Sequence, residues 1–383
     1  MAIVSLQKCS TYENSEVKAA IRAALKNIGF NPAALRNKRV CLKPNLLMPF
    51  APERALTTHP EVFRAVAEIV REHTDNLVVI ESPNFFPLAS TMKKTGLFAV
   101  ATDLGIEIAD NTAEAVIRNE KGKRFKQFDI SRALFDVDAV ISIPKLKTHG
   151  FTHYTGAVKN LFGAMPGTKK SRMHMRAPSQ IEFSEFLLDL YGALLTGFGK
   201  KMRILHVMDA VIGMEGEGPG PSGKPRHIGA VLASEDAVAL DYVAVNLVGL
   251  NEKKVLTLRE GFSRGYGASG PDDISVVGED ISRMRIHDFV PSKVTMMGGV
   301  FWPMTSPTVK NLFVEKPVPQ AGSCTLCYNC MKVCPSGAIS EADGGRVPRY
   351  NHRKCIRCYC CMETCPAAAI FLKKGRLQWM LKI

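Results

Sequence analysis

Cysteine is the residue type whose spacing most directly indicates chemistry in this chain. Of eleven cysteines, nine fall between Cys324 and Cys365, whereas Cys9 and Cys41 stand alone and are expected in the core. Crowded thiols favour a metal site, and the alternative, a set of disulfides, requires an oxidising compartment. The first residues, MAIVSLQKCS, lack the basic and long apolar stretches of a secretory signal. We therefore expect a cytoplasmic protein whose clustered thiols bind metal.

The clustered cysteines form two runs with the same spacing, C-x2-C-x2-C-x3-C-P. This is the bacterial ferredoxin spacing, in which the fourth cysteine of each run ligates the other 4Fe-4S cluster. Zinc is not expected, because its sites use paired C-x2-C ligands. Cys360 is the spare thiol; the x2 spacing favours Cys361 over Cys360 as ligand, so we expect Cys360 to be buried near a cluster without binding it. Two 4Fe-4S clusters are expected, held by Cys324, Cys327, Cys330 and Cys365, and by Cys355, Cys358, Cys361 and Cys334.

The segment that carries these cysteines is basic. Residues 322–375 contain eight Lys or Arg and three acids, and the whole chain has a net charge of +14. Cations near a surface attract acidic partners, so we expect an acidic redox protein as electron donor or acceptor. Simple solubility is the alternative explanation. No motif typical of nucleic-acid binding accompanies the basic residues, so nucleic acid is not an expected partner.

The elements that precede the cysteines alternate between apolar β-rich runs and amphipathic helical runs. This alternation predicts an α/β domain, a mostly parallel sheet with helices on both faces, over residues 1–290. A connector at 291–321, a small ferredoxin-like α+β domain at 322–375 and a tail at 376–383 follow. The expected strands are 2–6, 38–43, 76–80, 138–143, 203–208 and 228–233, and the expected helices are 14–28, 60–73, 183–198 and 237–248.

Polar residues follow several of these strands, where an open α/β sheet places its ligand. Lys43 and Asn45 follow the second strand, and residues 144–170 follow the fourth as a long expected loop. This loop is rich in cations and contains no acid. A solvated face would explain the charges, but the glycines and the position after a strand favour an anion-binding loop. The candidates within it are Lys145, Lys147, His149, Lys159 and Asn160.

Two glycine-rich stretches fail as nucleotide motifs. GAMPGTKK at 163–170 has too few residues between its glycines for a P-loop, and a threonine precedes its lysine. In GMEGEGPGPSG, Pro221 occupies the third glycine position of a dinucleotide fingerprint. Neither ATP nor NAD is therefore expected.

The text PKLKTHGFTHYTGAVKNLFGAMPG, with the earlier KPN and the later MEGEGP, resembles the iron-sulfur members of the family called domain of unknown function 362. The resemblance covers roughly residues 1–290 and implies the α/β fold and the ferredoxin companion, but no assigned reaction. The residues that match its motifs are Lys43, Asn45, Lys145, Lys147, His149, Lys159, Asn160, Asp209, Glu215 and Asp241.

These observations support a reductase that passes single electrons from the clusters to an anionic small molecule or flavin-like cofactor. Lys145, Lys147, His149 and Lys159 would bind anionic oxygens and supply protons. Lys43, Asn45, Asn160, Asp209 and Glu215 would hold the cofactor, the two acids through a metal or polar groups. The alternative is an electron-transfer partner whose α/β domain only docks another enzyme. No run of 18 apolar residues occurs, so no transmembrane segment is expected, although the basic, apolar tail leaves membrane docking open.

Overall fold

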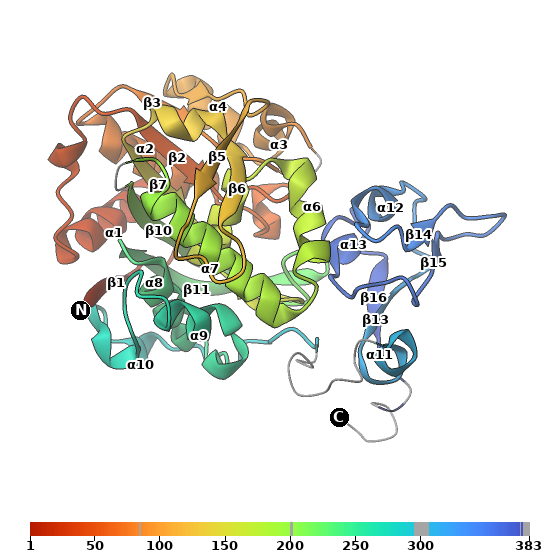
Figure 1. Ribbon diagram of the computed structural model, residues 1–383. Coiled ribbons are helices and arrows are strands. Elements are labelled where there is room, and N and C mark those ends of the chain that lie inside the picture. Colours follow the sequence, from red (N-terminus) through yellow and green to blue (C-terminus); the bar gives the residue numbers. More distant parts are fainter. Residues whose placement is uncertain (84–85, 200–201, 295–305, 376, 378–383) are drawn as a thin grey trace.

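The structure is a computed structural model that describes residues 1–83, 86–199, 202–294, 306–375 and 377. An α/β body is joined to a small cysteine-rich module that lies at one side of it, beside helix α6 (Figure 1). The VFWPM segment at 300–304 and nearly all of the expected tail lie outside the described residues. The body confirms the expected fold class, a mostly parallel sheet with helices on both faces.

The central sheet follows the order β12-β1-β11-β10-β7-β2-β3-β4, with β8 beside β10 and β9 beside β8. The pairs that join β10, β7, β2, β3 and β4 are parallel, whereas β11 is antiparallel to both β1 and β10. The strands of the body are β1 (Ala2–Lys8), β2 (Val40–Pro44), β3 (Leu77–Val79), β4 (Glu107–Ile108), β5 (Glu114–Arg118), β6 (Gln127–Ser131), β7 (Ala139–Ile143), β8 (Lys145–His149), β9 (His153–Thr155), β10 (Arg203–Gly216), β11 (Gly223–Ser234) and β12 (Ile274–Gly278).

Helices cover both faces of the sheet because alternate strand residues point to opposite sides. In β2, Cys41 packs into one apolar cluster, while Val40 and Leu42 pack into the other. The first cluster contains residues of α5, α7, α8 and α9, and the second contains residues of α1 to α4. The helices of the body are α1 (Asn14–Asn27), α2 (Pro60–Arg71), α3 (Leu88–Lys94), α4 (Leu97–Asp103), α5 (Ala157–Asn160), α6 (Gly167–Arg176), α7 (Gln180–Thr196), α8 (Ala237–Leu247), α9 (Leu256–Phe262) and α10 (Ile281–Met284).

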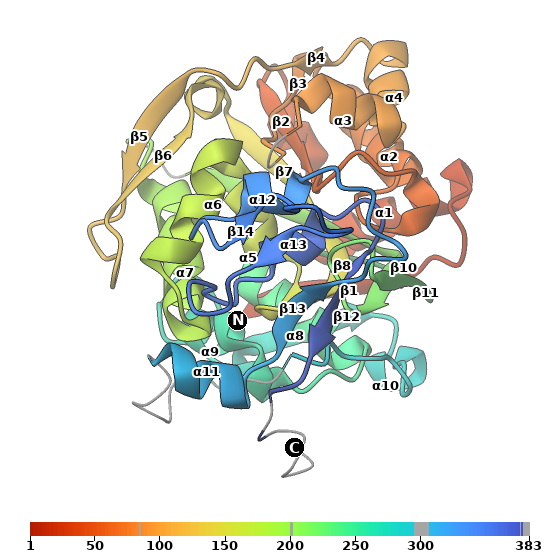
Figure 2. The same cartoon turned by 90° about the vertical axis from the view of Figure 1, so that its right-hand side faces the viewer.

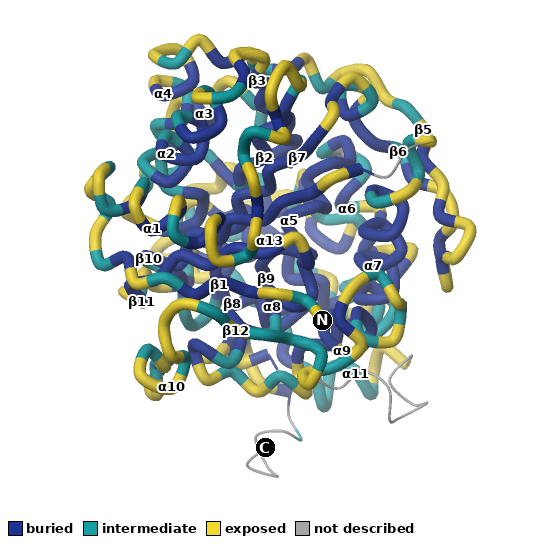
Figure 3. The backbone as a smooth tube through the Cα atoms, turned by 90° about the vertical axis from the view of Figure 1, so that its left-hand side faces the viewer, coloured by how far each residue is buried: buried dark blue, intermediate teal, exposed yellow. Residues whose placement is uncertain are grey.

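Local sequence explains where two of the helices begin. Helix α2 starts at Pro60, whose fixed φ suits the first turn, and the His59 ring accepts a hydrogen bond from the Glu61 amide at 3.2 Å. Helix α7 begins with a capping box between Ser179 and Glu182. Figure 3 shows the central strands in the colour of buried residues. Burying each large aliphatic side chain contributes about 1.5–3 kcal/mol, so these faces hold the layers together.

The segment at 144–170 is not the loop that the sequence suggested. It forms β8, β9 and α5, and then enters α6, because β10 continues to Gly216 and offers an edge to β8. The expected strand at 203–208 is thus only the first part of β10. Several cations of this segment are correspondingly buried rather than solvated: Lys145 and Lys147 are 2% and 1% exposed, whereas Lys159 and Lys169 are partly exposed.

The cysteine-rich module begins within the expected connector. Strand β13 pairs antiparallel with β16 near the other end of the module, and β14 pairs with β15. Figure 2 shows the module in front of α5, α6 and β8 of the body. Its elements are α11 (Pro307–Phe313), β13 (Lys316–Pro319), α12 (Asn329–Val333), β14 (Ile339–Ser340), β15 (Arg349–Tyr350), α13 (Cys360–Glu363) and β16 (Ile370–Lys373).

Candidate iron–sulfur centres and adjoining cavity

Eight cysteines of the module surround two small voids. The two groups have the crossed composition expected from the spacing, because the fourth cysteine of each run lies with the first three of the other. Tyr350 borders both voids. The first group comprises Cys324, Cys327, Cys330 and Cys365, and the second comprises Cys334, Cys355, Cys358 and Cys361.

The backbone around the voids fits iron–sulfur ligation. Leu326 and Tyr328 in the first run, and Arg357 and Tyr359 at the same offsets in the second, have φ between 53° and 63°. This left-handed conformation is energetically unfavourable for bulky residues. Where right- and left-handed residues alternate, successive backbone N–H groups point into one concavity that binds anions, as in many Fe–S sites. These residues would therefore aim amides at the sulfurs of two 4Fe-4S clusters. The repeat extends to the fourth cysteines, since the amides four residues after Cys334 and Cys365 each donate to their sulfur at 3.2 Å.

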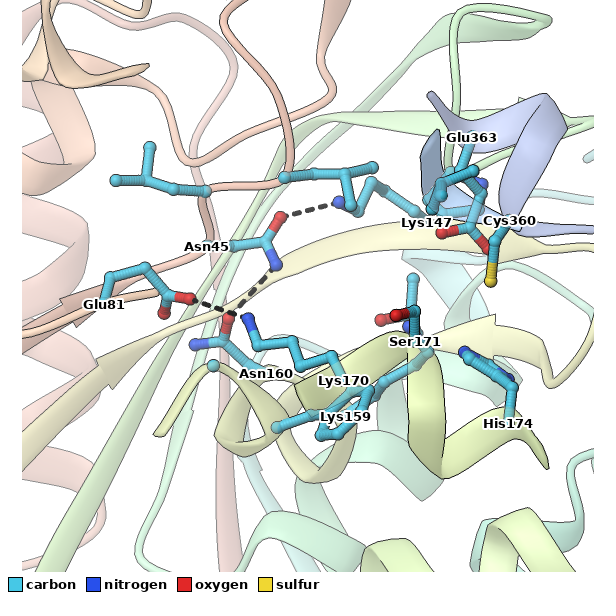
Figure 4. Close-up of a pocket in the computed structure, with 17 residues that line it drawn as sticks. Asn45, Glu81, Lys147, Lys159, Asn160, Lys170, Ser171, His174, Cys360 and Glu363 are labelled. Carbon is cyan, nitrogen blue, oxygen red and sulfur yellow. Dashed lines mark hydrogen bonds and ion pairs between the residues drawn. The ribbon is translucent and has the colours of Figure 1, made fainter. Parts of the chain in front are cut away.

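A cavity of about 60 Å³ lies between the body and the module. Most of its wall comes from the ends of β2, β3 and β8 and from α5 and α6, while Val333, Cys360 and Glu363 complete it from the module. Figure 4 shows Cys360 and Glu363 on one side and Asn45 and Asn160 on the other. Cys360 also borders the void of the second cysteine group. The cavity is thus separated from that group by a single helix, α13.

Two predicted amides and a lysine form one hydrogen-bonded row at the cavity wall (Figure 4). The Lys147 ammonium donates to Asn45 Oδ1 at 2.6 Å and to the Leu56 carbonyl at 2.7 Å. Asn45 Nδ2 donates in turn to Asn160 Oδ1 at 3.1 Å. Burial lowers the pKa of Lys147 well below its usual value, and the nearby charge of Lys159 lowers it further. Three residues that the sequence singled out, on three separate segments, are thus hydrogen-bonded neighbours in the structure.

Lys43 also reaches this region, but in an ion pair. It is 1% exposed and pairs with Glu81, which follows β3. Lys170 of α6 lies 3.8 Å from the other oxygen of Glu81, and burial lowers the pKa of Lys170 to about 8. A Cβ on Gly163 would collide with the Glu81 carboxylate and the Lys43 ammonium, so this glycine leaves room for the pair.

Lys159 and Glu363 face the cavity from opposite domains. Lys159 retains intermediate exposure, and among the described residues its ammonium has no hydrogen-bond or ion-pair partner. Burial lowers its pKa, and Glu363 and Cys360 oppose that shift. Burial raises the pKa of Glu363, against the opposing effect of Lys159 and Lys147. Asp241 fixes the position of α5 by accepting bonds from the amides of Ala157 and Val158 at 2.6 and 3.0 Å.

His149 lies behind the cavity, at the contact between body and module. Its Nδ1 accepts a hydrogen bond from the Phe151 amide at 3.0 Å, so the remaining proton of a neutral ring is on Nε2. Nε2 lies 3.4 Å from Glu363 Oε1. Burial lowers the pKa of His149 well below its usual value, and the ring is therefore neutral. This histidine does not line the cavity.

Lys145, Asp209 and Glu215 lie elsewhere. Lys145 Nζ is 2.8 Å from both Asp209 Oδ2 and the Tyr12 hydroxyl, in a closed buried network away from the cavity lining. Glu215 accepts a bond from the Val290 amide at 3.0 Å and so holds the start of the connector. Among the residues with described positions, no three His, Cys, Asp or Glu side chains converge as ligands of one metal ion.

The sequence reasoning did not assign the cavity residues Glu81, Lys170, His174 and Glu363 to a site, and it interpreted Cys360 only as a spare buried thiol. Glu81 was visible as a polar residue directly after a predicted strand. His174 is stacked on Phe183 with ring centroids 4.3 Å apart, and nothing in its spacing distinguishes it from a core histidine. Cys360 and Glu363 could not be placed, because only the docking of the module brings them to the body.

A family model described as domain of unknown function 362 matches residues 40–246, more than half of the chain. The chain belongs to this family. A second model, described as a 4Fe-4S dicluster domain, matches residues 316–366, so this member of the domain of unknown function 362 family carries an iron–sulfur module of that type. Both findings confirm the resemblance that the motifs suggested.

One curated relative of this family member is "Thylakoid-associated protein sll1697" of Synechocystis sp., which is 32% identical over 257 residues, or 67% of this chain and 77% of that protein. Two solved structures are more distant. The lactate racemase apoprotein of Thermoanaerobacterium thermosaccharolyticum has a TM-score of 0.38 at 14% identity and 63% coverage of this chain, and a Thermotoga maritima protein has 0.36 at 12% and 60%. The aligned region spans 57% of each solved chain.

Proposed function

We propose that this protein is an iron–sulfur reductase, which passes single electrons from two 4Fe-4S clusters to an anionic small molecule in the cavity between body and module. The observation that carries the proposal is the position of Cys360, which borders both the cavity and the void of the second cysteine group. A ligand in the cavity would therefore lie next to that group. Electron transfer is the chemistry that such clusters supply when bound.

The first cysteine group contains the one fully exposed thiol among the eight, which suggests a direction across the module. Cys327 is exposed, whereas the second group has two partly exposed and two buried cysteines. The first group would face an external electron donor, and the second would face the ligand. This arrangement supports entry at the outer loop and exit at α13.

The residues of this chain would bind and orient the ligand. Lys159 and Lys147 would neutralise its oxygens, and Asn45 would fix its orientation through the row of amides. Cys360 and Glu363 of helix α13 would complete the binding site on the module side. Burial of the ligand in the cavity would strengthen each of these contacts, because hydrogen bonds to charged groups are stronger where the local dielectric constant is low.

We further propose a reducing compartment such as the cytoplasm, where cysteine ligands stay reduced. In the part of the chain that the structure describes, no helix has the length and apolar character needed to cross a bilayer. The description of the Synechocystis relative would be compatible with an electron donor at a membrane surface.

The test uses protein purified without oxygen, which should contain about eight iron atoms per chain. Native mass spectrometry would detect a copurifying small anion, and electron paramagnetic resonance of the reduced protein would be recorded with and without it. The ligand should alter the signal of the cluster that Cys334→Ser damages, and leave the other signal unchanged. Unchanged signals, an empty cavity and a copurifying protein would instead favour an electron-transfer partner without activity of its own.

A further inference from the structure

The volume of the cavity limits what it can hold. A water molecule needs roughly 10–15 Å³ of such volume, so about 60 Å³ holds about four to six non-hydrogen atoms. Pockets for drug-sized ligands or organic cofactors have about 300 Å³ or more. The cavity therefore suits a compact ligand, and a flavin-like cofactor does not fit it.

The charges of the cavity wall leave positive charge in excess. Glu81 is shared by Lys43 and Lys170, so this group carries one cation more than it has anions. Lys147 and Lys159 face the single carboxylate of Glu363, so amines outnumber carboxylates at this part of the wall as well. A wall with this balance favours an anion over a metal cation or a neutral ligand.

Several hydrogen-bond donors at the cavity are unused among the described residues. Lys159 has none of its three N–H groups engaged. Lys147 uses two of its three, and Asn45 Nδ2 uses one of its two. His174, only 6% exposed, has a buried Nδ1 without a partner. An oxyanion only accepts hydrogen bonds and so complements these donors, which His174 joins when its ring carries the proton on Nδ1.

We propose that the cavity binds a compact oxyanion of the carboxylate or phosphate class, held by Lys159 and Lys147 with the Asn45 amide and His174, opposite Glu363. This rests on the proposed function and names its ligand class. Burial lowers the pKa values of Lys159 and Lys147, and an anion between them would offset that cost.

Isothermal titration calorimetry on the iron-loaded, full-length protein tests the proposal with oxalate and inorganic phosphate, and with FMN as an oversized phosphate ester. At least one of the two small anions should bind with a stoichiometry of one, and which of them does so distinguishes carboxylate from phosphate. FMN should not compete. Lys159→Met should weaken binding about tenfold or more, because it removes a charge-assisted contact. The exposed Lys94→Met is the charge-matched control and should leave affinity unchanged.

Glu363→Gln provides a test in the opposite direction. It removes the carboxylate that faces the anion while keeping its size, so affinity should increase several-fold with the iron content unchanged. This variant also decides the question if Lys159→Met does not fold. The proposal is overturned if neither small anion binds, if Lys159→Met binds as tightly as the parent, if Glu363→Gln leaves affinity the same or weaker, or if FMN occupies the site. If neither oxalate nor phosphate binds to the parent protein while its iron content and the paramagnetic signals of both clusters are intact, the oxyanion proposal fails but the reductase proposal stands.

Discussion

At the scale of single residues, the lysines of the β8 to α6 segment serve two different purposes. Lys145 is engaged by Asp209 and Tyr12 in the core, whereas Lys159 lies beside the cavity and has no partner among the residues that the structure describes. The sequence shows five lysines without a nearby acid, but the fold supplies acids from elsewhere, such as Glu81 and Asp209. Charge clustering in a sequence is therefore a weak guide to charge clustering in space, because buried ions are paired wherever the fold allows.

Gly163 tests how tightly the Lys43–Glu81 pair is built. Gly163→Ala should lower the free energy of unfolding by about 1–3 kcal/mol, because its methyl group would overlap a buried ion pair that cannot move into solvent. Denaturant unfolding would measure the change. Gly270→Ala is the matched control, since its backbone is extended and no atom lies within 4 Å of the added carbon. A loss below about 0.5 kcal/mol at Gly163 would mean that the pair repacks at little cost.

The predictable part of the site consists of residues that follow predicted strands. Asn45 and Lys147 were found because parallel strands place their carboxyl ends at one edge of the sheet. Glu215 was misleading, because β10 continues past the predicted end and carries this residue to the connector. Glu363 could not be found, because a contact across more than 200 residues depends on docking and leaves no local pattern.

At the scale of elements, those with a clear start residue and a regular apolar pattern in the sequence were predicted well, and those without such a pattern were missed. Helix α2 combines a proline start with Val62, Val66, Ile69 and Val70 on one face, and its predicted and observed starts agree. Strand β8 was missed because Lys and His make up three of its five residues, and β9 because it has only three residues. They are strands because β10 pairs with β8, so tertiary pairing overrides local propensity.

The two cysteine runs are elements whose ligation can be separated. Cys334→Ser should damage the cluster of Cys355, Cys358 and Cys361 and spare the one nearer its own run, because Cys334 borders the second void. Iron content should fall by up to about half, and one of two paramagnetic signals should change. Cys360→Ser is the control and should keep both signals. Zinc in place of iron, or loss of the signal that Cys327→Ser also removes, would contradict the crossed ligation.

At the scale of the whole molecule, only some of the basic residues of the module are exposed. Arg353 and Lys354 are exposed, whereas Arg357 is 4% exposed and donates to Asn311 and to the Cys355 carbonyl. All three are among the eight basic residues that make the module positive in the sequence. Only the first two can meet an acidic partner, and Arg357 instead ties α11 to the second cysteine loop.

The docking of an acidic electron donor should depend on ionic strength through these exposed cations. Reduction by such a donor should slow as salt rises from about 0.05 to 0.5 M, because screening shortens the Debye length. Replacing Arg353 and Lys354 with Gln should flatten that dependence, as stopped-flow kinetics would measure. Replacing the exposed Lys93 and Lys94 of α3 with Gln removes the same charge from the body and should leave the salt dependence unchanged. A rate that is indifferent to salt in the parent would assign Arg353 and Lys354 to solubility.

The shared wall at α13 also bears on how freely the two parts of this chain could be exchanged in evolution or by design. A carrier module that only delivers electrons could be replaced by any other of similar potential. Here the turn that holds Cys358 and Cys361 also contributes Cys360 and Glu363 to the chamber, and Gly220 of the body leaves no room for a side chain against Glu363. A grafted module with the same eight cysteine ligands but other residues at positions 360 and 363 would deliver electrons to a cavity with altered ligand selectivity. The two parts are therefore expected to be inherited together, as one unit of recognition.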